Sequence, residues 1–437
     1  MFNGMIVVFL LAAVVAFILN LEVPTAYTNM AAGGLFVEFM ATIILAYIMI
    51  VKMLPEKKAQ ARFLNSFLSS FMISLLILHF YWTPELPTTG FDPARYYNYA
   101  ASLVKGQLLA EGLNYFGVVY FYYFLFSLLG LDPLIPLYLN VLLVLYACLM
   151  LANLLYRTGV PYKMSALLLL IPEIMYYNVM SSREILCMVF GVYVIINLFK
   201  IYTKEISYLR LIPTLIILAL MIFIRPPYGI CTILVIGIYM MFATHRKRKT
   251  IVYIVVLLVV AVVCIGAAGA IGDNGNIGSV LSSTIENRVT GENEMNDDFT
   301  YGKSSIAAKL IPHNPIEFVV FGVIRTMAYV IVPPSVILNP INSLNVITDV
   351  RGYTEWTTLL MMIYIIRVYK TVKNNFKHSE VIRLIAISFF VFFLLVGMFN
   401  INLIQQRYRV VYDMFYFSLA LIYMSRYKQK KTVAIMS

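Results

Sequence analysis

The chain has 437 residues, of which 61% are hydrophobic and only 12% are charged. This composition excludes an ordinary soluble domain, because apolar stretches of about 20 residues, long enough to cross a bilayer, recur along the chain. The net charge of +12 does not indicate nucleic-acid binding, since basic residues concentrate in short loops between the apolar stretches, as membrane insertion requires.

The first apolar stretch, residues 1–21, lacks a basic leader region and a small-residue cleavage site, so we expect a retained span. The loop at 245–249 sets the orientation, because four consecutive cations in a short loop indicate the cytoplasmic side. Counting from this loop predicts about 12 crossings: three before residue 84, six between about 133 and 271, and three from about 353 to 425. The predicted fold is all-α, a single polytopic domain over residues 1–437 in the inner (plasma) membrane, with both termini cytoplasmic.

Two apolar stretches, 113–131 and 316–338, do not fit this count as single crossings. They belong to the first extracytoplasmic loop, 84–132, and to a large extracytoplasmic loop region, 272–352. We expect both to be re-entrant or interfacial and to line a cavity, because partly inserted backbone needs protein or water to satisfy its polar groups. The alternative is that one loop is assigned to the wrong side.

The first outer loop carries an acid at the start of a predicted helix. Asp92 precedes Pro93, a pattern typical of a helix N-cap, and Arg95 and Tyr96 follow. Capping alone would explain Asp92. The functional alternative is that Asp92 activates an acceptor hydroxyl or holds a cation, while the neighbouring tyrosines pack against a sugar.

Arginines recur beside other spans on the same predicted side. Arg183 and Glu184 begin a helix and could simply pair with neighbours, whereas Arg225 ends an apolar run with no acid nearby in sequence. Guanidinium groups bind phosphate oxygens in a bidentate manner, so these arginines predict an anionic ligand. The predicted phosphate- or donor-binding residues are Arg95, Arg183, Arg225, Arg325, Arg407 and Arg409. Asp92 is the predicted catalytic residue, and the further candidates are Glu184, His313, Arg351, Tyr96 and Asp413.

Several short motifs follow one another between about residues 80 and 245. They are Asp92-Pro-Ala-Arg95-Tyr96, Gly112-Leu-Asn-Tyr-Phe116, the run from Leu128 to Asn140, Tyr156-Arg157, Ile171-Pro172-Glu173, Ser182-Arg183-Glu184 and Arg225-Pro226. Their order resembles the GT-C superfamily of polytopic glycosyltransferases, which use polyprenyl-linked sugars on the extracytoplasmic face. The resemblance gives Asp92 the position of the family's catalytic or metal-linked carboxylate. Here the loop follows the third span instead of the first and lacks paired acids, which leaves the use of a divalent cation open and assigns no metal ligand.

The expected function is therefore that of a membrane glycosyltransferase, either a hexosyltransferase or a polysaccharide polymerase. It would move sugar from a polyprenyl-phosphate or pyrophosphate donor to a glycan acceptor in cell-surface polysaccharide biosynthesis. The chain is also similar to bacterial O-antigen and capsule polymerases and ligases, which hold polyprenyl pyrophosphate with outer arginines.

Two alternatives are not enzymes that transfer sugar. The first is a lipid-linked saccharide flippase or transporter, and the second is an accessory membrane scaffold. Transport is disfavoured because the sequence has no internal repeat and few ionisable residues within spans, mainly Glu38 and Glu173. Walker A, HExxH and GxSxG motifs are missing as well. The expected partners are thus the lipid bilayer, the donor and the acceptor, and not nucleic acid.

Overall fold

The structure is a computed structural model that describes residues 2–20, 32–81, 92–107, 116–179, 183–242, 317, 320–324, 326, 350–399 and 409–436. Every regular element in these ranges is a helix, which confirms the predicted all-α class for the described part of the chain. The cationic loop at 245–249 and most of the large loop region, 272–352, lie outside these ranges.

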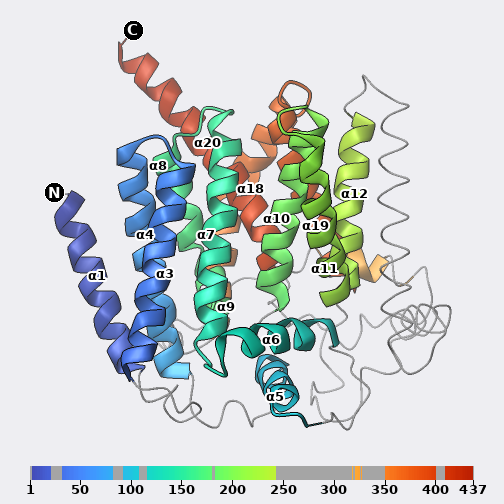
Figure 1. Cartoon of the computed structure of the whole chain (residues 1–437). Helices are drawn as coiled ribbons and strands as arrows, with labels where there is room; N and C mark the ends of the chain where they lie inside the picture. The colour runs from blue at the N-terminus through green and yellow to red at the C-terminus, as the bar shows by residue number, and fades with distance from the viewer. Residues whose placement is uncertain are drawn as a thin grey trace, which may run out of the picture.

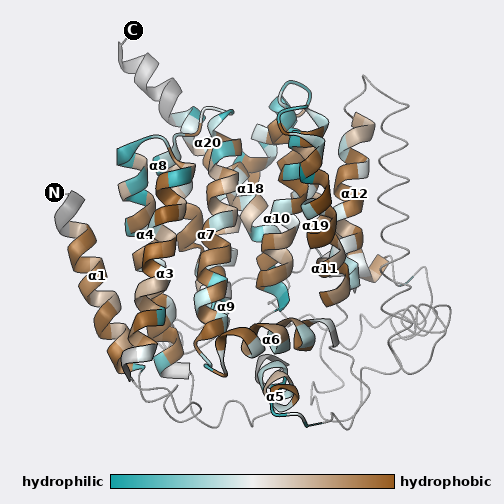
Figure 2. Ribbon diagram, in the orientation of Figure 1, coloured by the Kyte–Doolittle hydropathy of each residue, from teal (hydrophilic) through white to brown (hydrophobic). Residues whose placement is uncertain are grey.

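Four of the described helices are long and apolar enough to cross a membrane, judged by length and composition: Gly34–Met53, Lys57–His79, Ile135–Tyr156 and Arg183–Tyr202. Shorter apolar helices cover Met5–Leu19, Gly117–Leu129, Tyr208–Ile224 and Pro226–Phe242. Apolar residues cover most of these helices in Figure 2. The protein is therefore membrane-associated by its helices, while the count of about 12 crossings stays a prediction.

The longer helices run side by side as a bundle (Figure 1). They are α1 (Phe2–Leu19), α3 (Ala32–Met53), α4 (Lys57–Tyr81), α7 (Ile135–Tyr156), α10 (Arg183–Tyr202), α11 (Leu211–Ile224), α12 (Pro226–Phe242), α18 (Val350–Asn375), α19 (Glu380–Phe399) and α20 (Val410–Met436). Two short helices, α5 (Asp92–Val104) and α6 (Phe116–Leu129), lie at the lower end of the bundle, with α6 running across it (Figure 1).

The bundle has two chemically different ends. The basic end, uppermost in Figure 1, carries the short connections at 54–56, 157–161, 203–207 and 376–379. Side chains fasten these connections to neighbouring helices: the Arg383 guanidinium donates to the Phe242 carbonyl over 3.3 Å, and the Ser425 hydroxyl to the Gly159 carbonyl over 2.8 Å. The opposite end, here called the site end, contains α5, α6, the start of α10 and the junction of α11 with α12.

One pass through the bundle is not a continuous helix. It consists of α8 (Tyr162–Ser165), the 3-10 helix η2 (Ala166–Leu170) and α9 (Pro172–Tyr177). Pro172 has no amide hydrogen and holds Ile171 in an extended conformation, which ends η2 and starts α9. The Glu173 amide next to this break donates to the Thr357 hydroxyl of α18 over 3.2 Å. The break therefore brings the Glu173 backbone against α18.

Glycines set two features of the site end. Gly106 adopts a φ of +75° and ends α5, with its amide bonded to the Leu103 carbonyl and the Gln107 amide to the Ser102 carbonyl. Gly117 lets α6 pack directly on the last turn of α11, because a Cβ atom there would lie 2.1 Å from the Phe223 carbonyl oxygen. The crossing helix α6 is thus seated on the turn that leads to Arg225.

Candidate functional site

The arginine cluster at the site end consists of Arg183, Glu184 and Arg225. Arg183 and Glu184 are the first two residues of α10, and Arg225 lies between α11 and α12. Pro226 follows Arg225 and disfavours a helical conformation for it, so Arg225 is extended, with φ −158° and ψ 94°. The chain reverses at this point, and the Arg225 guanidinium reaches the start of α10.

Glu184 joins the two arginines. Its Oε1 accepts from Arg225 Nη1 over 2.7 Å and lies 3.4 Å from Arg183 Nε. The Glu184 side chain is 3% exposed, against 12% for Arg183 and 16% for Arg225. Two guanidinium groups thus gather around one buried carboxylate at the partly exposed edge of the bundle, and guanidinium groups are well suited to bind an anion.

Aromatic rings pack against both guanidinium groups. Arg183 lies over the Tyr96 ring at 5.7 Å, and Arg225 over the Tyr228 ring at 5.2 Å. Such cation–π contacts fix a guanidinium without neutralising it. Tyr96 is buried and belongs to α5, so it brings this helix next to the start of α10.

The helix α5 relates Asp92 to the cluster. Asp92 is its first residue, as the sequence predicted for a residue at a helix start, and Tyr96 is one turn further on. The backbone of Asp92 therefore lies about one helical turn before the tyrosine that contacts Arg183. Arg95, by contrast, is an exposed residue of α5.

The other predicted site residues fall in different places. Arg351 is in the first turn of α18, on the described backbone. Arg325, Arg407 and His313 lie outside the described residues. The structure therefore brings together Arg183, Arg225, Glu184 and Tyr96 from the predicted set.

Arg409 and Asp413 belong to a second cluster, which is fully buried. Arg409 is 1% exposed and donates to the Thr358 hydroxyl, and its Nη2 lies 3.0 Å from the Met361 sulfur. Its Nε lies 3.8 Å from a carboxylate oxygen of Glu173. The Glu173 and Asp413 side chains are both 0% exposed, and their carboxyl groups interact electrostatically.

The charges of this buried cluster compensate one another. Two ionised carboxylates that interact in a buried site repel each other, and the Arg409 guanidinium 3.8 Å from Glu173 offsets part of that repulsion. The Asp413 and Arg409 positions were found by sequence, but their partner Glu173 lies more than 200 residues away in the chain.

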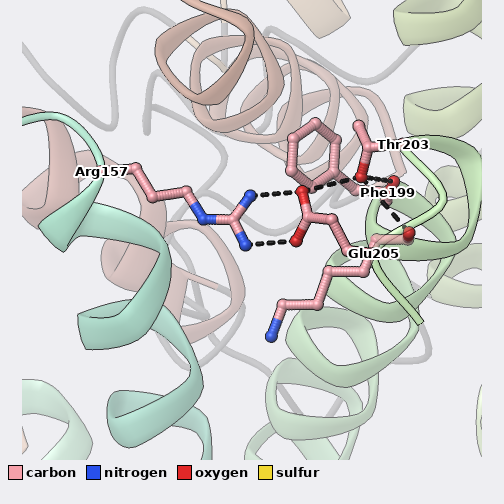
Figure 3. Close-up of polar contacts among 5 residues, drawn as sticks. Arg157, Phe199, Thr203 and Glu205 are labelled. Carbon is pink, nitrogen blue, oxygen red and sulfur yellow. Dashed lines mark hydrogen bonds and ion pairs between the residues drawn. The ribbon is translucent and has the colours of Figure 1, made fainter.

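At the basic end, an exposed ion pair joins α7 to α10. The two terminal nitrogens of Arg157 face the two carboxylate oxygens of Glu205, and the Thr203 hydroxyl donates to Glu205 Oε1 over 2.8 Å (Figure 3). The Arg157 guanidinium holds the pKa of Glu205 below its ordinary value of 4.5. This pair fastens the ends of α7 and α10 at the basic end, whereas the arginine cluster lies at the start of α10 (Figure 1).

Two further results concern metal binding and similarity to known proteins. In the part of the chain that the structure describes, no group of three or more His, Cys, Asp and Glu residues is arranged to hold a metal ion. Comparisons with family models, with curated proteins and with solved structures gave no match to this chain.

Proposed function

We propose that the protein is a membrane glycosyltransferase that acts at its site end on a polyprenyl-phosphate or polyprenyl-pyrophosphate sugar donor. The observation that carries the proposal is the arginine cluster: two partly exposed guanidinium groups contact one buried carboxylate, from 2.7 and 3.4 Å. In this proposal the two guanidinium groups bind the donor phosphate, and the site end faces the extracytoplasmic side.

The proposed reaction is a direct displacement. The acceptor hydroxyl oxygen attacks the anomeric carbon of the donor sugar, and its proton passes to the Asp92 carboxylate. The bond between the anomeric carbon and the phosphate oxygen breaks, and its electron pair leaves with the polyprenyl phosphate. Arg183 and Arg225 stabilise the negative charge that develops on that phosphate. Tyr96 holds the Arg183 guanidinium in place beside the helix that begins with Asp92.

Arg409 has no role in this reaction, because its side chain is 1% exposed and serves the buried acids. The same chemistry would serve a polymerase or ligase that transfers a whole oligosaccharide from a pyrophosphate donor. The length of the product distinguishes the two, since a hexosyltransferase adds one sugar and a polymerase adds a repeat unit.

Lipid-linked saccharide transport is the second candidate, and the buried cluster of Arg409, Glu173 and Asp413 favours it. Ionisable groups that are buried in a membrane bundle are expensive and often belong to transport pathways. A transporter would move an intact donor across the bilayer, whereas the proposed enzyme cleaves it.

The test uses purified protein in nanodiscs with a radiolabelled polyprenyl-phosphate hexose and a glycan acceptor. Wild-type protein is expected to form a labelled glycan, and Asp92→Asn and Arg225→Lys to reduce the rate by at least about 100-fold. Arg157→Ala is the matched control, because it removes an arginine ion pair at the opposite end. Equal rates in Asp92→Asn, Arg225→Lys and wild type would remove the proposed site, and an intact donor that crosses liposome membranes would favour transport.

A further inference from the structure

Two tyrosines hold an exposed arginine near the basic end of the bundle. Arg367 belongs to α18, and its guanidinium lies 5.9 Å from the centre of the Tyr364 ring on the same helix. The Tyr423 ring of α20 lies 5.7 Å from the same guanidinium. Contacts with aromatic rings hold a guanidinium in place without cancelling its positive charge. These two rings, here called the tyrosine clamp, therefore fix a cation where α18 packs against α20.

Two more cations lie beside the clamp. Arg426 follows Tyr423 by three residues on α20, and its guanidinium donates to the side-chain oxygen of Asn375, the last residue of α18. Lys370 is an exposed residue of α18, three residues after Arg367. Among the described residues, no Asp or Glu forms an ion pair with Arg367, Lys370 or Arg426. The described acids therefore do not neutralise the positive charge along the contact between α18 and α20.

Exposed apolar side chains adjoin these cations on α18. Ile363 and Ile366 are 52% and 65% exposed, and they precede Arg367 and Lys370 by four residues each. Residues four apart are neighbours on a helix surface. Apolar side chains on the outside of a membrane bundle face lipid acyl chains, and cations one turn nearer to the helix end reach the headgroups. This part of α18 therefore offers an apolar surface that continues into a cationic one.

Other arginines at the basic end have partners that explain them by structure alone. Arg157 pairs with the Glu205 carboxylate. Arg383 donates to the carbonyl oxygens of Phe376 and Lys377 over 3.0 and 2.9 Å, as well as to the Phe242 carbonyl. These two arginines fasten connections between helices. Arg367 differs from both, because the groups that position it are rings that leave its charge uncompensated.

We propose that α18 and α20 form a binding site for one anionic phospholipid at the basic end. Arg367 and Arg426 bind the lipid phosphate, since guanidinium groups match phosphate oxygens and basic sites between membrane helices bind anionic headgroups. An acyl chain of the same lipid lies along Ile363 and Ile366. The exposed isoleucines favour a lipid over a free phosphate ion, which makes no use of an apolar surface.

The lipid site does not depend on the proposed reaction, so its test needs no sugar donor. Delipidated protein in detergent is titrated with phosphatidylglycerol or with phosphatidylcholine, and native mass spectrometry counts the lipids bound. We expect wild type to bind one phosphatidylglycerol more tightly than phosphatidylcholine and to keep it in the presence of an equal concentration of inorganic phosphate. Equal affinity for the two lipids, or displacement by inorganic phosphate, would overturn the proposal.

Variants separate this site from a general attraction of the basic end for anionic lipids. Arg367→Gln is expected to weaken phosphatidylglycerol binding by about 5-fold, whereas the matched control Lys58→Gln, which removes an exposed cation at the start of α4, should bind as wild type does. Tyr423→Leu removes one ring of the clamp and should weaken binding, while Tyr423→Phe keeps the ring and should not. Equal losses in Arg367→Gln and Lys58→Gln, or no loss in either Arg367→Gln or Tyr423→Leu, would contradict the site.

Discussion

Replacing Arg225 with alanine removes the closer of the two guanidinium groups that contact Glu184. The lost contact is 2.7 Å long, and Arg183 remains 3.4 Å from the same oxygen. Leaving a buried charge with no partner costs about 3–5 kcal/mol. A hydrogen bond to a charged group contributes about 1.5–3 kcal/mol. Because Arg183 still compensates Glu184, we expect the lower range, a coupling energy of about 2 kcal/mol between Arg225 and Glu184.

A double-mutant cycle measures this coupling. It compares the unfolding free energies of wild type, Arg225→Ala, Glu184→Gln and the double variant in mixed detergent micelles. The matched control is a cycle of Arg157→Ala and Glu205→Gln, whose side chains are 37% and 31% exposed. Exposed pairs of this kind contribute about 0.2–1 kcal/mol. A coupling energy for Arg225 and Glu184 below about 0.5 kcal/mol would refute the reasoning.

The same four proteins separate anion binding from packing. Glu184→Gln removes the compensating charge, so it should bind inorganic pyrophosphate about 5-fold more tightly, even though it is less stable than wild type. Arg225→Ala should bind pyrophosphate more weakly by a similar factor. Calorimetry on the detergent-purified proteins measures both the expected increase and the expected decrease in pyrophosphate affinity. Weaker pyrophosphate binding by Glu184→Gln than by wild type would mean that the cluster stabilises helix packing and does not bind anions.

Three further predictions concern other parts of the molecule. Gly117→Ala should destabilise the protein by about 1–3 kcal/mol, because the new Cβ would lie 2.1 Å from the Phe223 carbonyl oxygen. An unchanged melting temperature would contradict the packing of α6 on α11. The pKa of Glu205 is lowered in the fold, so the Arg157 pair stabilises the protein above about pH 4.5 and this contribution is lost as the pH falls through the folded-state pKa. Melting temperatures of wild type and Glu205→Gln should therefore differ by a small amount at pH 7 and converge near pH 3, and a difference that grows toward pH 3 would contradict this sign. Arg409→Met should destabilise the protein by about 3–5 kcal/mol, because it leaves two buried carboxyl groups with no cation, and a loss below about 1 kcal/mol would show that Arg409 does not compensate them.

The sequence predicted local features of the site end well. Asp92 before Pro93 indicated a helix start, and α5 begins there. The pair Arg225-Pro226 indicated a break between two apolar helices, and the structure has that break. Both predictions depend on backbone preferences of proline and its neighbours, which act within a few residues.

The pairings across the bundle could not be predicted from the sequence. Arg225 has no acid near it in the chain, yet it pairs with Glu184, which lies 41 residues before it. Arg409 and Glu173 are likewise far apart in sequence, yet the Arg409 Nε lies 3.8 Å from a Glu173 carboxylate oxygen. Charge patterns show which residues are expensive to bury, but helix packing decides which of them meet.

Arg409 is a second residue whose contacts across the bundle could not be predicted from the sequence. Its position near a predicted outer loop suggested phosphate binding, whereas the structure surrounds it with Thr358, Met361 and Glu173. Arg409 immediately precedes α20 and lies four residues before Asp413, and this spacing is a local signal in the sequence that the two side chains can meet.

The most direct test of the account is whether the purified protein alone transfers sugar, and whether the arginine cluster is needed. Wild-type protein in nanodiscs is given a labelled polyprenyl-phosphate hexose and a glycan acceptor, and the labelled product is counted beside Arg183→Ala/Arg225→Ala and Arg157→Ala. The account predicts product with wild type and with Arg157→Ala, and essentially none with the double variant. A donor left intact by the wild-type protein, or transfer that survives the loss of both arginines, would contradict it.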